Sequence, residues 1–231
     1  MSKFVNVSVI GPGHLGDGLP NQDATGYFND GNYWAIIVCD GMGSRVHAET
    51  GSYTAVESIK AVLINADFES SSKEIIGAFY QHWLDKLKNY SIKPNDAATT
   101  VLVAWGSNNG IFRYFQLGDG VISTRHKVIT PRSSDQFSNL TTGLGISKKY
   151  SDWSVGKEEL SPTDNTLLLM SDGISEDILD HNAFTDALAI FSKNKSSRRI
   201  KKHLKKLFVD WPTPFHVDDK SLAMVIFNDK R

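Results

Sequence analysis

The predicted strands of this chain follow one another closely, and two pairs of helices interrupt their order. Residues 99–105 and 111–117 are rich in apolar residues and flank a Ser-Asn-Asn-Gly turn at 107–110, a pattern typical of a β-hairpin. Strands in a hairpin pair antiparallel, whereas a doubly wound sheet needs a helix between successive parallel strands. The sequence therefore predicts an α+β fold with an antiparallel core and helices outside it.

The spacing of apolar residues predicts the remaining elements. Further strands are expected at 4–10, 33–39, 121–129, 153–155, 166–170 and 222–227, and helices at 48–63, 182–192 and 196–209. A turn is expected at 11–13, and another helix is expected to begin among the serines 70–72. Residues 131–150 are polar and are expected to form an excursion without regular structure. No repeat or linker divides the chain, so we expect a single domain over residues 1–231.

The composition restricts the partners and the location that we expect. The 25 basic and 26 acidic residues nearly cancel, which gives no reason to expect nucleic acid as a partner. No apolar stretch approaches the roughly 20 residues that span a bilayer, and the first residues lack the apolar region of a signal peptide. The single cysteine excludes an internal disulfide and fits a reducing compartment. We therefore expect a cytoplasmic monomer without a membrane partner.

Four short acidic segments lie far apart in the sequence, each beside the end of an apolar run. They contain Asp23, Asp40, Asp172 and the adjacent pair Asp218 and Asp219. One Asp-Gly step is a common turn, but several carboxylates brought into one cleft repel each other unless a cation or a proton neutralises them. Carboxylate and carbonyl oxygens favour Mg²⁺ or Mn²⁺ over Zn²⁺, and the seven histidines show no zinc-binding spacing. The four segments therefore predict a site for a hard divalent cation.

Eight short motifs, in this order, resemble those of the metal-dependent protein phosphatase 2C family in its bacterial type. They are NQDA at 21–24, VCDGMGS at 38–44, AETGS at 48–52, ATT at 98–100, LGDG at 117–120, LTTGLG at 140–145, LLMSDGISE at 168–176 and DDKS at 218–221. The resemblance runs from about residue 7 to residue 227. It implies a central antiparallel β-sandwich flanked by helices on both outer faces, and a serine/threonine phosphatase that acts on phosphoproteins.

Carried onto this chain, the resemblance implies a centre with two Mn²⁺ or Mg²⁺ ions. Asp40 would bridge both ions, and the carbonyl oxygen of Gly41 would bind one of them. Asp172 and Asp218 would complete the shell of the other ion. Ser221 stands where the family has a threonine, three residues after its metal-binding aspartate, and this spacing selects Asp218. Because Asp219 is adjacent, the assignment could slip by one residue.

Two further carboxylates have roles that the resemblance implies. Asp23 would hold a metal-bound water in place, so that Asp23 and Asp40 would together activate water. Asp119 lies where some members bind a third metal. Two neighbouring cations acidify water, and the resulting hydroxide can attack the phosphorus of phosphoserine or phosphothreonine without a phosphoenzyme. The lone Cys39 lies inside an apolar strand, and the chain has no Cys-x5-Arg loop, which excludes a cysteine nucleophile.

Three positions depart from the commoner family pattern. Gly18 stands where many members carry an arginine that binds the substrate phosphate. His14 is either a replacement for that arginine, as a phosphate contact, or an ordinary exposed loop histidine. Gln22 stands where a glutamate is frequent. Met42 occupies the position of a histidine that protonates the leaving group in some members, and His47 is either its substitute or a surface histidine of a helix.

Two alternatives to a protein phosphatase stay open at this point. One is a catalytically weak or inactive pseudophosphatase that binds a phosphoprotein, which Gly18 favours and the intact set Asp40, Asp172 and Asp218 disfavours. The other is a hydrolase of small phosphate esters. The basic segment 193–206 is either an amphipathic helix with a solvated face or a docking surface for an acidic or phosphorylated partner. Residues 131–150 lie where related enzymes have a mobile flap, and we expect them to govern substrate access.

Overall fold

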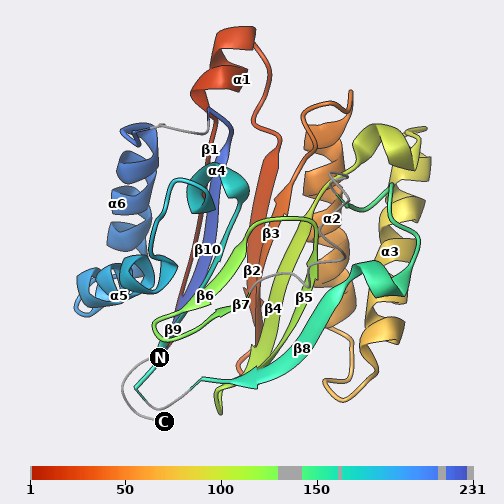
Figure 1. Ribbon diagram of the computed structural model, residues 1–231. Helices are drawn as coiled ribbons and strands as arrows, with labels where there is room; N and C mark the ends of the chain where they lie inside the picture. Colours follow the sequence, from red (N-terminus) through yellow and green to blue (C-terminus); the bar gives the residue numbers. More distant parts are fainter. Residues whose placement is uncertain (1, 130–141, 161–162, 213–216, 228–231) are drawn as a thin grey trace.

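Two five-stranded antiparallel sheets pack face to face in the computed structural model, which describes residues 2–129, 142–160, 163–212 and 217–227 (Figure 1). The strand order of the first sheet is β1 (Lys3–Val9), β10 (Lys220–Ile226), β9 (Thr166–Met170), β6 (Val121–Thr124) and β7 (Val128–Ile129). The strand order of the second sheet is β2 (Asp23–Asn29), β3 (Tyr33–Asp40), β4 (Val101–Ser107), β5 (Ile111–Leu117) and β8 (Ser154–Glu159).

Helices cover the outer face of each sheet. The long helices are α2 (Ala48–Leu63), α3 (Ser72–Asn89), α5 (His181–Ser192) and α6 (Ser197–Val209), and the short ones are α1 (Pro12–Asp17), α4 (Asp172–Ser175), η1 (Pro94–Ala97) and η2 (Tyr150–Asp152). Helices α2 and α3 lie on the second sheet, and α5 and α6 lie on the first (Figure 1). The four layers confirm the predicted α+β sandwich with helices on both outer faces.

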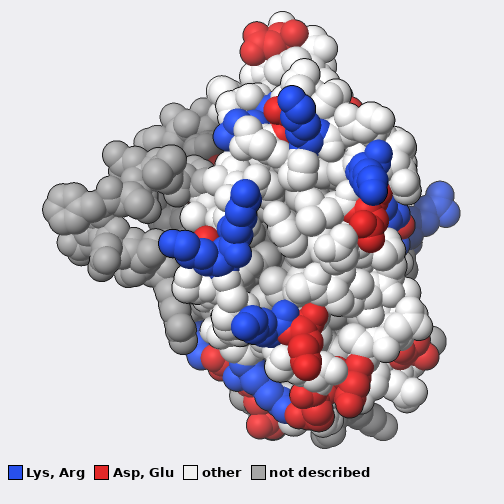
Figure 2. Space-filling view, turned by 90° about the vertical axis from the view of Figure 1, so that its right-hand side faces the viewer, with Lys and Arg blue, Asp and Glu red and all other residues white. Residues whose placement is uncertain are grey.

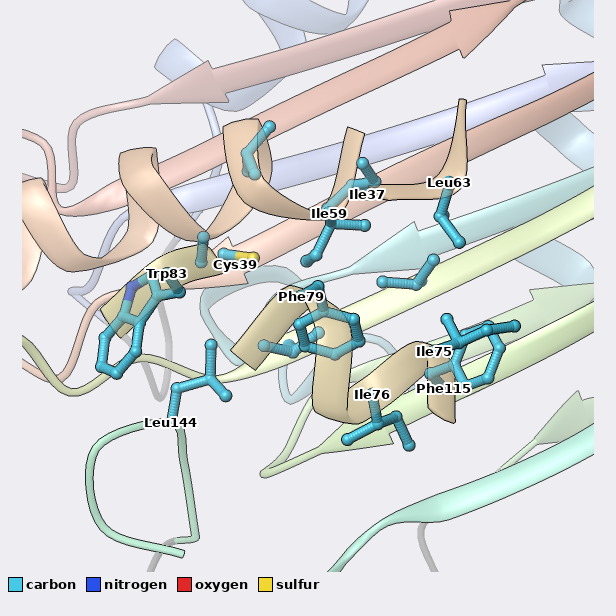
Figure 3. Packing of buried hydrophobic residues seen from close by; sticks show 14 of the residues in the cluster. Ile37, Cys39, Ile59, Leu63, Ile75, Ile76, Phe79, Trp83, Phe115 and Leu144 are labelled. Carbon is cyan, nitrogen blue, oxygen red and sulfur yellow. The ribbon is translucent and has the colours of Figure 1, made fainter. Parts of the chain in front are cut away.

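The central strand β3 is apolar on both faces because each face packs against another layer. Ile36 and Val38 point into the core between the two sheets, whereas Ile37 and Cys39 point into the core beneath α2 and α3. Figure 3 shows Ile37 and Cys39 among side chains of these helices. Such double burial produces the continuous apolar run that predicted this strand.

Cys39 is part of this core and has no access to substrate. Its side chain has 0% exposure. Burial raises the pKa of the thiol well above its ordinary value, and the nearby carboxyl groups of Asp23 and Asp40 raise it further. A thiol that stays protonated in an apolar core is no nucleophile, as the sequence indicated.

The basic segment near the end of the chain forms one side of α6. Ile200, Leu204 and Phe208 are buried against the first sheet, which confirms an amphipathic helix. Its exposed side chains include Arg198, Arg199, Lys201, Lys202, Lys205 and Lys206. Figure 2 shows a different pattern over α2 and α3, where Lys and Arg lie among Asp and Glu.

Several elements differ from the sequence prediction. Residues 11–13, expected as a turn, instead lead into α1, since Pro12 occupies the first helical turn, where no backbone N–H is needed. Strand β2 was not predicted, because Gly26 interrupts its apolar residues. A Cβ at Gly26 would lie 2.5 Å from Cγ1 of Val56 on α2, so the glycine permits close packing of the helix. Strand β8 continues beyond the predicted 153–155 to Glu159, because it is an edge strand that tolerates charged residues.

Only part of the polar segment 131–150 lies within the described residues. From residue 142 onward it forms no helix or strand until η2, apart from a bridge between Thr99 and Leu144. The expected control of substrate access by residues 131–150 stays a prediction, because residues 131–141 lie outside the described residues. Among the described residues, no helix combines the length and the apolar character needed to span a membrane.

Truncation of a core side chain should show how far the sandwich depends on the layer beneath α2. Ile37→Ala removes a fully buried side chain, and we expect a loss of about 2–5 kcal/mol in the free energy of unfolding. Ile64→Ala is the matched control, because Ile64 is 52% exposed, and it should change stability by no more than about 0.5 kcal/mol. Urea unfolding followed by circular dichroism measures both, and equal losses would contradict this assignment of the core.

Candidate metal centre

The four acidic segments meet at one end of the sandwich. The pairing of β2 with β3 places Asp23 directly opposite Asp40. Asp172 opens α4 immediately after β9, and Asp218 immediately precedes the turn into β10, which pairs with β9. Figure 1 shows these strand ends below α1, at the upper end of the two sheets. The antiparallel topology therefore brings together residues that are up to about 200 positions apart in the sequence.

The carboxyl groups in this cluster strongly perturb one another. Burial raises the pKa of Asp40 well above its ordinary value, and Asp23, Asp172 and Asp218 raise it further. Burial and the charges of Asp219 and Asp172 raise the pKa of Asp23 from 3.8 to about 8, against the opposing effect of the nearby Ser221 and Ser171 hydroxyl groups. The buried ammonium group of Lys220 offsets part of the charge of Asp218, Asp219 and Asp23, but Asp23 and Asp40 still keep their protons to a higher pH than free aspartate does.

Some oxygen atoms of the cluster lack a partner within the described chain. Oδ2 of Asp23 accepts a hydrogen bond from the Ser171 hydroxyl at 3.1 Å, but Oδ1 of Asp23 and Oδ1 of Asp172 are buried with no hydrogen bond from any described residue. Unsatisfied buried carboxylate oxygens are costly unless a cation binds them. This set of oxygen donors fits Mg²⁺ or Mn²⁺.

The backbone around Asp40 is fixed by two threonines. The Thr100 hydroxyl accepts the N–H of Asp40 at 3.0 Å, and the Thr99 hydroxyl donates to the Asp40 carbonyl at 2.8 Å. At Gly41 a Cβ would lie 2.6 Å from the carbonyl oxygens of Gln22 and Ala48, so only glycine fits there. These contacts hold the Asp40 carboxylate and the neighbouring backbone in one arrangement.

The adjacent carboxylates Asp218 and Asp219 have different surroundings. The Asp219 side chain is only 1% exposed, and its two oxygens accept the backbone N–H groups of Gly11 at 2.7 Å and Gln22 at 2.6 Å. The Asp218 side chain is 40% exposed. Asp219 thus ties α1 and the start of β2 to β10, and this division favours Asp218 over Asp219 as the carboxylate left for a metal.

His14 lies inside the site and is not an ordinary exposed loop histidine. It belongs to α1, and its side chain is 14% exposed. Its Nδ1 lies 2.9 Å from Oδ2 of Asp219 and 3.7 Å from Oδ1 of Asp218. A Cβ at Gly43 would lie 3.7 Å from Nε2 of His14, so that nitrogen lies beside the loop that follows Asp40. His14 and the two aspartates are also close enough together to hold an ion.

The structure places the other predicted residues around this cluster. Asp119 is exposed on the turn between β5 and β6 and is not among the carboxyl groups that raise the pKa of Asp40 or Asp23, so its third-metal role stays a prediction. His47 is exposed at the start of α2, and Met42 is half-buried. Gly18 ends α1 in a left-handed conformation, with φ +68°, which an arginine would adopt only with strain.

The structure adds residues whose roles the sequence did not predict. The Ser171 hydroxyl donates to Asp23 and accepts the backbone N–H of Ser221 at 3.0 Å, which joins β2, β9 and β10. The only sequence signal for this role was a serine immediately before Asp172. Hydroxyl groups beside strand ends are too common for such a signal to identify a site.

The stability of the metal-free protein should fall as the pH rises from about 4 to about 8. The unfolded chain releases the Asp23 proton near pH 3.8, whereas the folded chain holds it up to about pH 8. In this window the native state binds more protons, so the free energy of unfolding decreases with pH. Asp23→Asn removes this contribution. Calorimetry in EDTA should therefore show that the melting temperature of the variant, relative to that of the wild-type protein, increases as the pH rises. Parallel pH profiles would contradict the perturbed pKa.

Comparisons with known proteins agree with this geometry. A family model described as protein phosphatase 2C matches residues 10–209. Among solved structures, the S. agalactiae serine/threonine phosphatase has a TM-score of 0.72 at 17% identity, with 99% of this chain and 100% of that chain covered. Serine/threonine phosphatase Stp1 from Staphylococcus aureus has a TM-score of 0.71 at 16% identity, with 99% and 96% covered. At such identities the likeness concerns the fold. No curated protein matches the chain.

Proposed function

The chain belongs to the protein phosphatase 2C family, and we propose that it hydrolyses phosphoserine and phosphothreonine in proteins with water activated at a centre of two Mn²⁺ or Mg²⁺ ions. The enzyme class is protein-serine/threonine phosphatase, as predicted from the sequence. The proposal rests chiefly on one observation. Asp23, Asp40 and Asp172 converge with so little compensation that burial and mutual repulsion raise the pKa of Asp40 well above its usual range.

Specific donors are available for the ions. Asp40, the carbonyl oxygen of Gly41, Asp172 and Asp218 would hold them. When bound, two such cations lower the pKa of a coordinated water far enough to provide a hydroxide nucleophile near neutral pH and neutralise charge on the phosphoryl group. The number of ions, including a third at Asp119, is part of the proposal.

The protein's own residues supply proton handling and orientation. Asp23, whose pKa is about 8 without metal, can accept a proton from water near neutral pH once cations lower that pKa. The Ser171 hydroxyl fixes Oδ2 of Asp23 at 3.1 Å and so directs Oδ1 toward the cluster. Nδ1 of His14 lies 2.9 Å from Oδ2 of Asp219, so a protonated imidazole would pair with that carboxylate and could offer Nε2 to an oxygen of the substrate phosphate.

A pseudophosphatase is not favoured. Such a protein needs no cluster of buried carboxylates that is stable only with protons or cations, since the cost of burial would bring no compensating activity. Hydrolysis of small phosphate esters alone remains a distinguishable outcome of the assay below. The proposed substrate is a phosphoprotein, since the fold family and the enzyme class both concern phosphorylated proteins.

Turnover should depend on Mn²⁺ or Mg²⁺ and on Asp40. We expect wild type to hydrolyse p-nitrophenyl phosphate and a phosphothreonine peptide only with the metal. Asp40→Asn keeps the shape of the side chain and removes its charge, so kcat/KM should fall by more than the roughly 10–100-fold that loss of an outer metal-site partner costs. If the wild-type protein shows no metal-dependent turnover above that of this variant, the proposed phosphatase activity is refuted. Turnover of the aryl ester without the peptide would indicate a hydrolase of small esters.

Replacement of His14 should weaken phosphate binding more than it slows chemistry. His14→Ala removes a charge-assisted contact, which predicts a KM increase of roughly 10-fold with a smaller change in kcat. His203→Ala is the matched control, because this histidine is exposed on α6, outside the acidic cluster. Steady-state kinetics with the phosphothreonine peptide measure both variants, and an unchanged KM would remove His14 from the phosphate site.

A further inference from the structure

A cleft of about 390 Å³ adjoins the candidate metal centre at Gly43, where a Cβ would lie 3.7 Å from Nε2 of His14. One wall is the segment between α1 and β2, with Leu19 and Pro20, and the other is the loop that joins β3 to α2, with Arg45 and Val46. Gln22 also lines it. Both walls are next to the acidic cluster in the chain, since Gln22 precedes Asp23 and the second loop begins after Asp40.

Gln22 offers a hydrogen-bonding group to this cleft. Its side chain is only 6% exposed, and its Oε1 is buried with no hydrogen bond from any described residue. Its backbone is firmly held, because its N–H donates to Asp219 at 2.6 Å and its carbonyl accepts the N–H of Gly41 at 3.1 Å. A buried amide oxygen left without a donor is expensive unless a ligand supplies one.

Arg45 brings a positive charge to the same cleft. Its Nε is buried without a hydrogen bond, and within the described chain it forms no ion pair with a carboxylate. The two other described arginines that are at least partly buried are engaged: Arg113 donates to the Phe68 carbonyl at 2.6 Å, and Arg125 pairs with Asp186 at 2.5 Å. A half-buried guanidinium without an acidic partner is suited to a bidentate contact with phosphate.

We propose that this cleft binds the phosphorylated segment of the substrate, with Arg45 holding the phosphate and the amide oxygen of Gln22 accepting an N–H of the peptide. The inference rests on the proposed function, and it names where the substrate lies. The exposed apolar side chains of Leu19 (41%) and Val46 (79%) then contact residues that flank the phosphorylated one. Gln22 adds no charge to the cleft, and the one carboxylate among its lining residues, the exposed Glu49, forms no ion pair with Arg45 within the described chain.

Binding can be measured without turnover. The probe is a fluorescein-labelled peptide that carries a difluoromethylene phosphonate in place of phosphothreonine phosphate, with Mn²⁺ present, followed by fluorescence anisotropy. We expect Arg45→Ala to raise Kd at least about 10-fold, and Arg45→Lys to give an intermediate Kd because it keeps the charge without the planar fork. Arg199→Ala, an exposed arginine on α6, is the matched control and should leave Kd unchanged.

Competition by inorganic phosphate identifies the group that Arg45 contacts. Phosphate should displace the probe from wild type at a concentration at least several-fold lower than from Arg45→Lys, which retains the charge and serves if the alanine variant does not fold. An unchanged Kd in both Arg45 variants would overturn the inference. Loss of peptide binding with unchanged phosphate competition would also overturn it, since the arginine would then contact the peptide alone.

The outcomes separate this inference from the proposed function. If the wild-type protein turns over substrate and the Kd for the probe does not depend on Arg45, the proposed phosphatase activity is supported and the proposed binding role of the cleft is wrong. If the Kd depends on Arg45 but the wild-type protein shows no metal-dependent turnover, the proposed binding site is supported and the proposed phosphatase activity is wrong.

Discussion

Repulsion among buried carboxylates is the constraint on which the rest of this structure depends. Asp23, Asp40 and Asp172 meet where two sheets end, and burial together with mutual repulsion raises the pKa of Asp40 and of Asp23. Such a cluster persists only if a much larger apolar core stabilises the fold around it. Strand β3 is buried from Trp34 to Cys39 and ends in the half-buried Asp40. This strand therefore joins the core directly to the cluster.

Backbone contacts, more than side-chain packing, fix the relative positions of the acidic segments. A Cβ at Gly11 would lie 2.2 Å from the carbonyl oxygen of Asp218, and one at Gly173 would lie 2.1 Å from that of Asp219. The chain entering β10 is thus enclosed between the start of α1 and the start of α4. Because Asp219 also accepts two backbone N–H groups, three segments distant in sequence are joined at one carboxylate. Asp218, next to it, is held by the same backbone while its side chain remains accessible.

The sequence predicted what depends on periodicity and on motif order, and missed what depends on tertiary contact. The layered α+β fold, the 111–117 hairpin strand and the acidic cluster follow from apolar spacing and from carboxylates at strand ends. Strand β2 and helix α1 could not be predicted in this way, because Gly26 and the glycines around Pro12 are selected by close packing and by turn geometry. The distinction between two adjacent aspartates was equally inaccessible, since it depends on which backbone N–H groups lie nearby in space.

His14 and Gly18 belong to the same short helix, since His14 lies within α1 and Gly18 ends it. Gly18 adopts φ +68° because it terminates α1, and a left-handed residue at a helix end is favourable for glycine and strained for arginine. The same short helix places His14 against Asp219. Helix α1 therefore disfavours an arginine at position 18 and places the imidazole of His14 beside a buried carboxylate. Arg45, on the loop after β3, adds a second positively charged group for phosphate in the adjoining cleft.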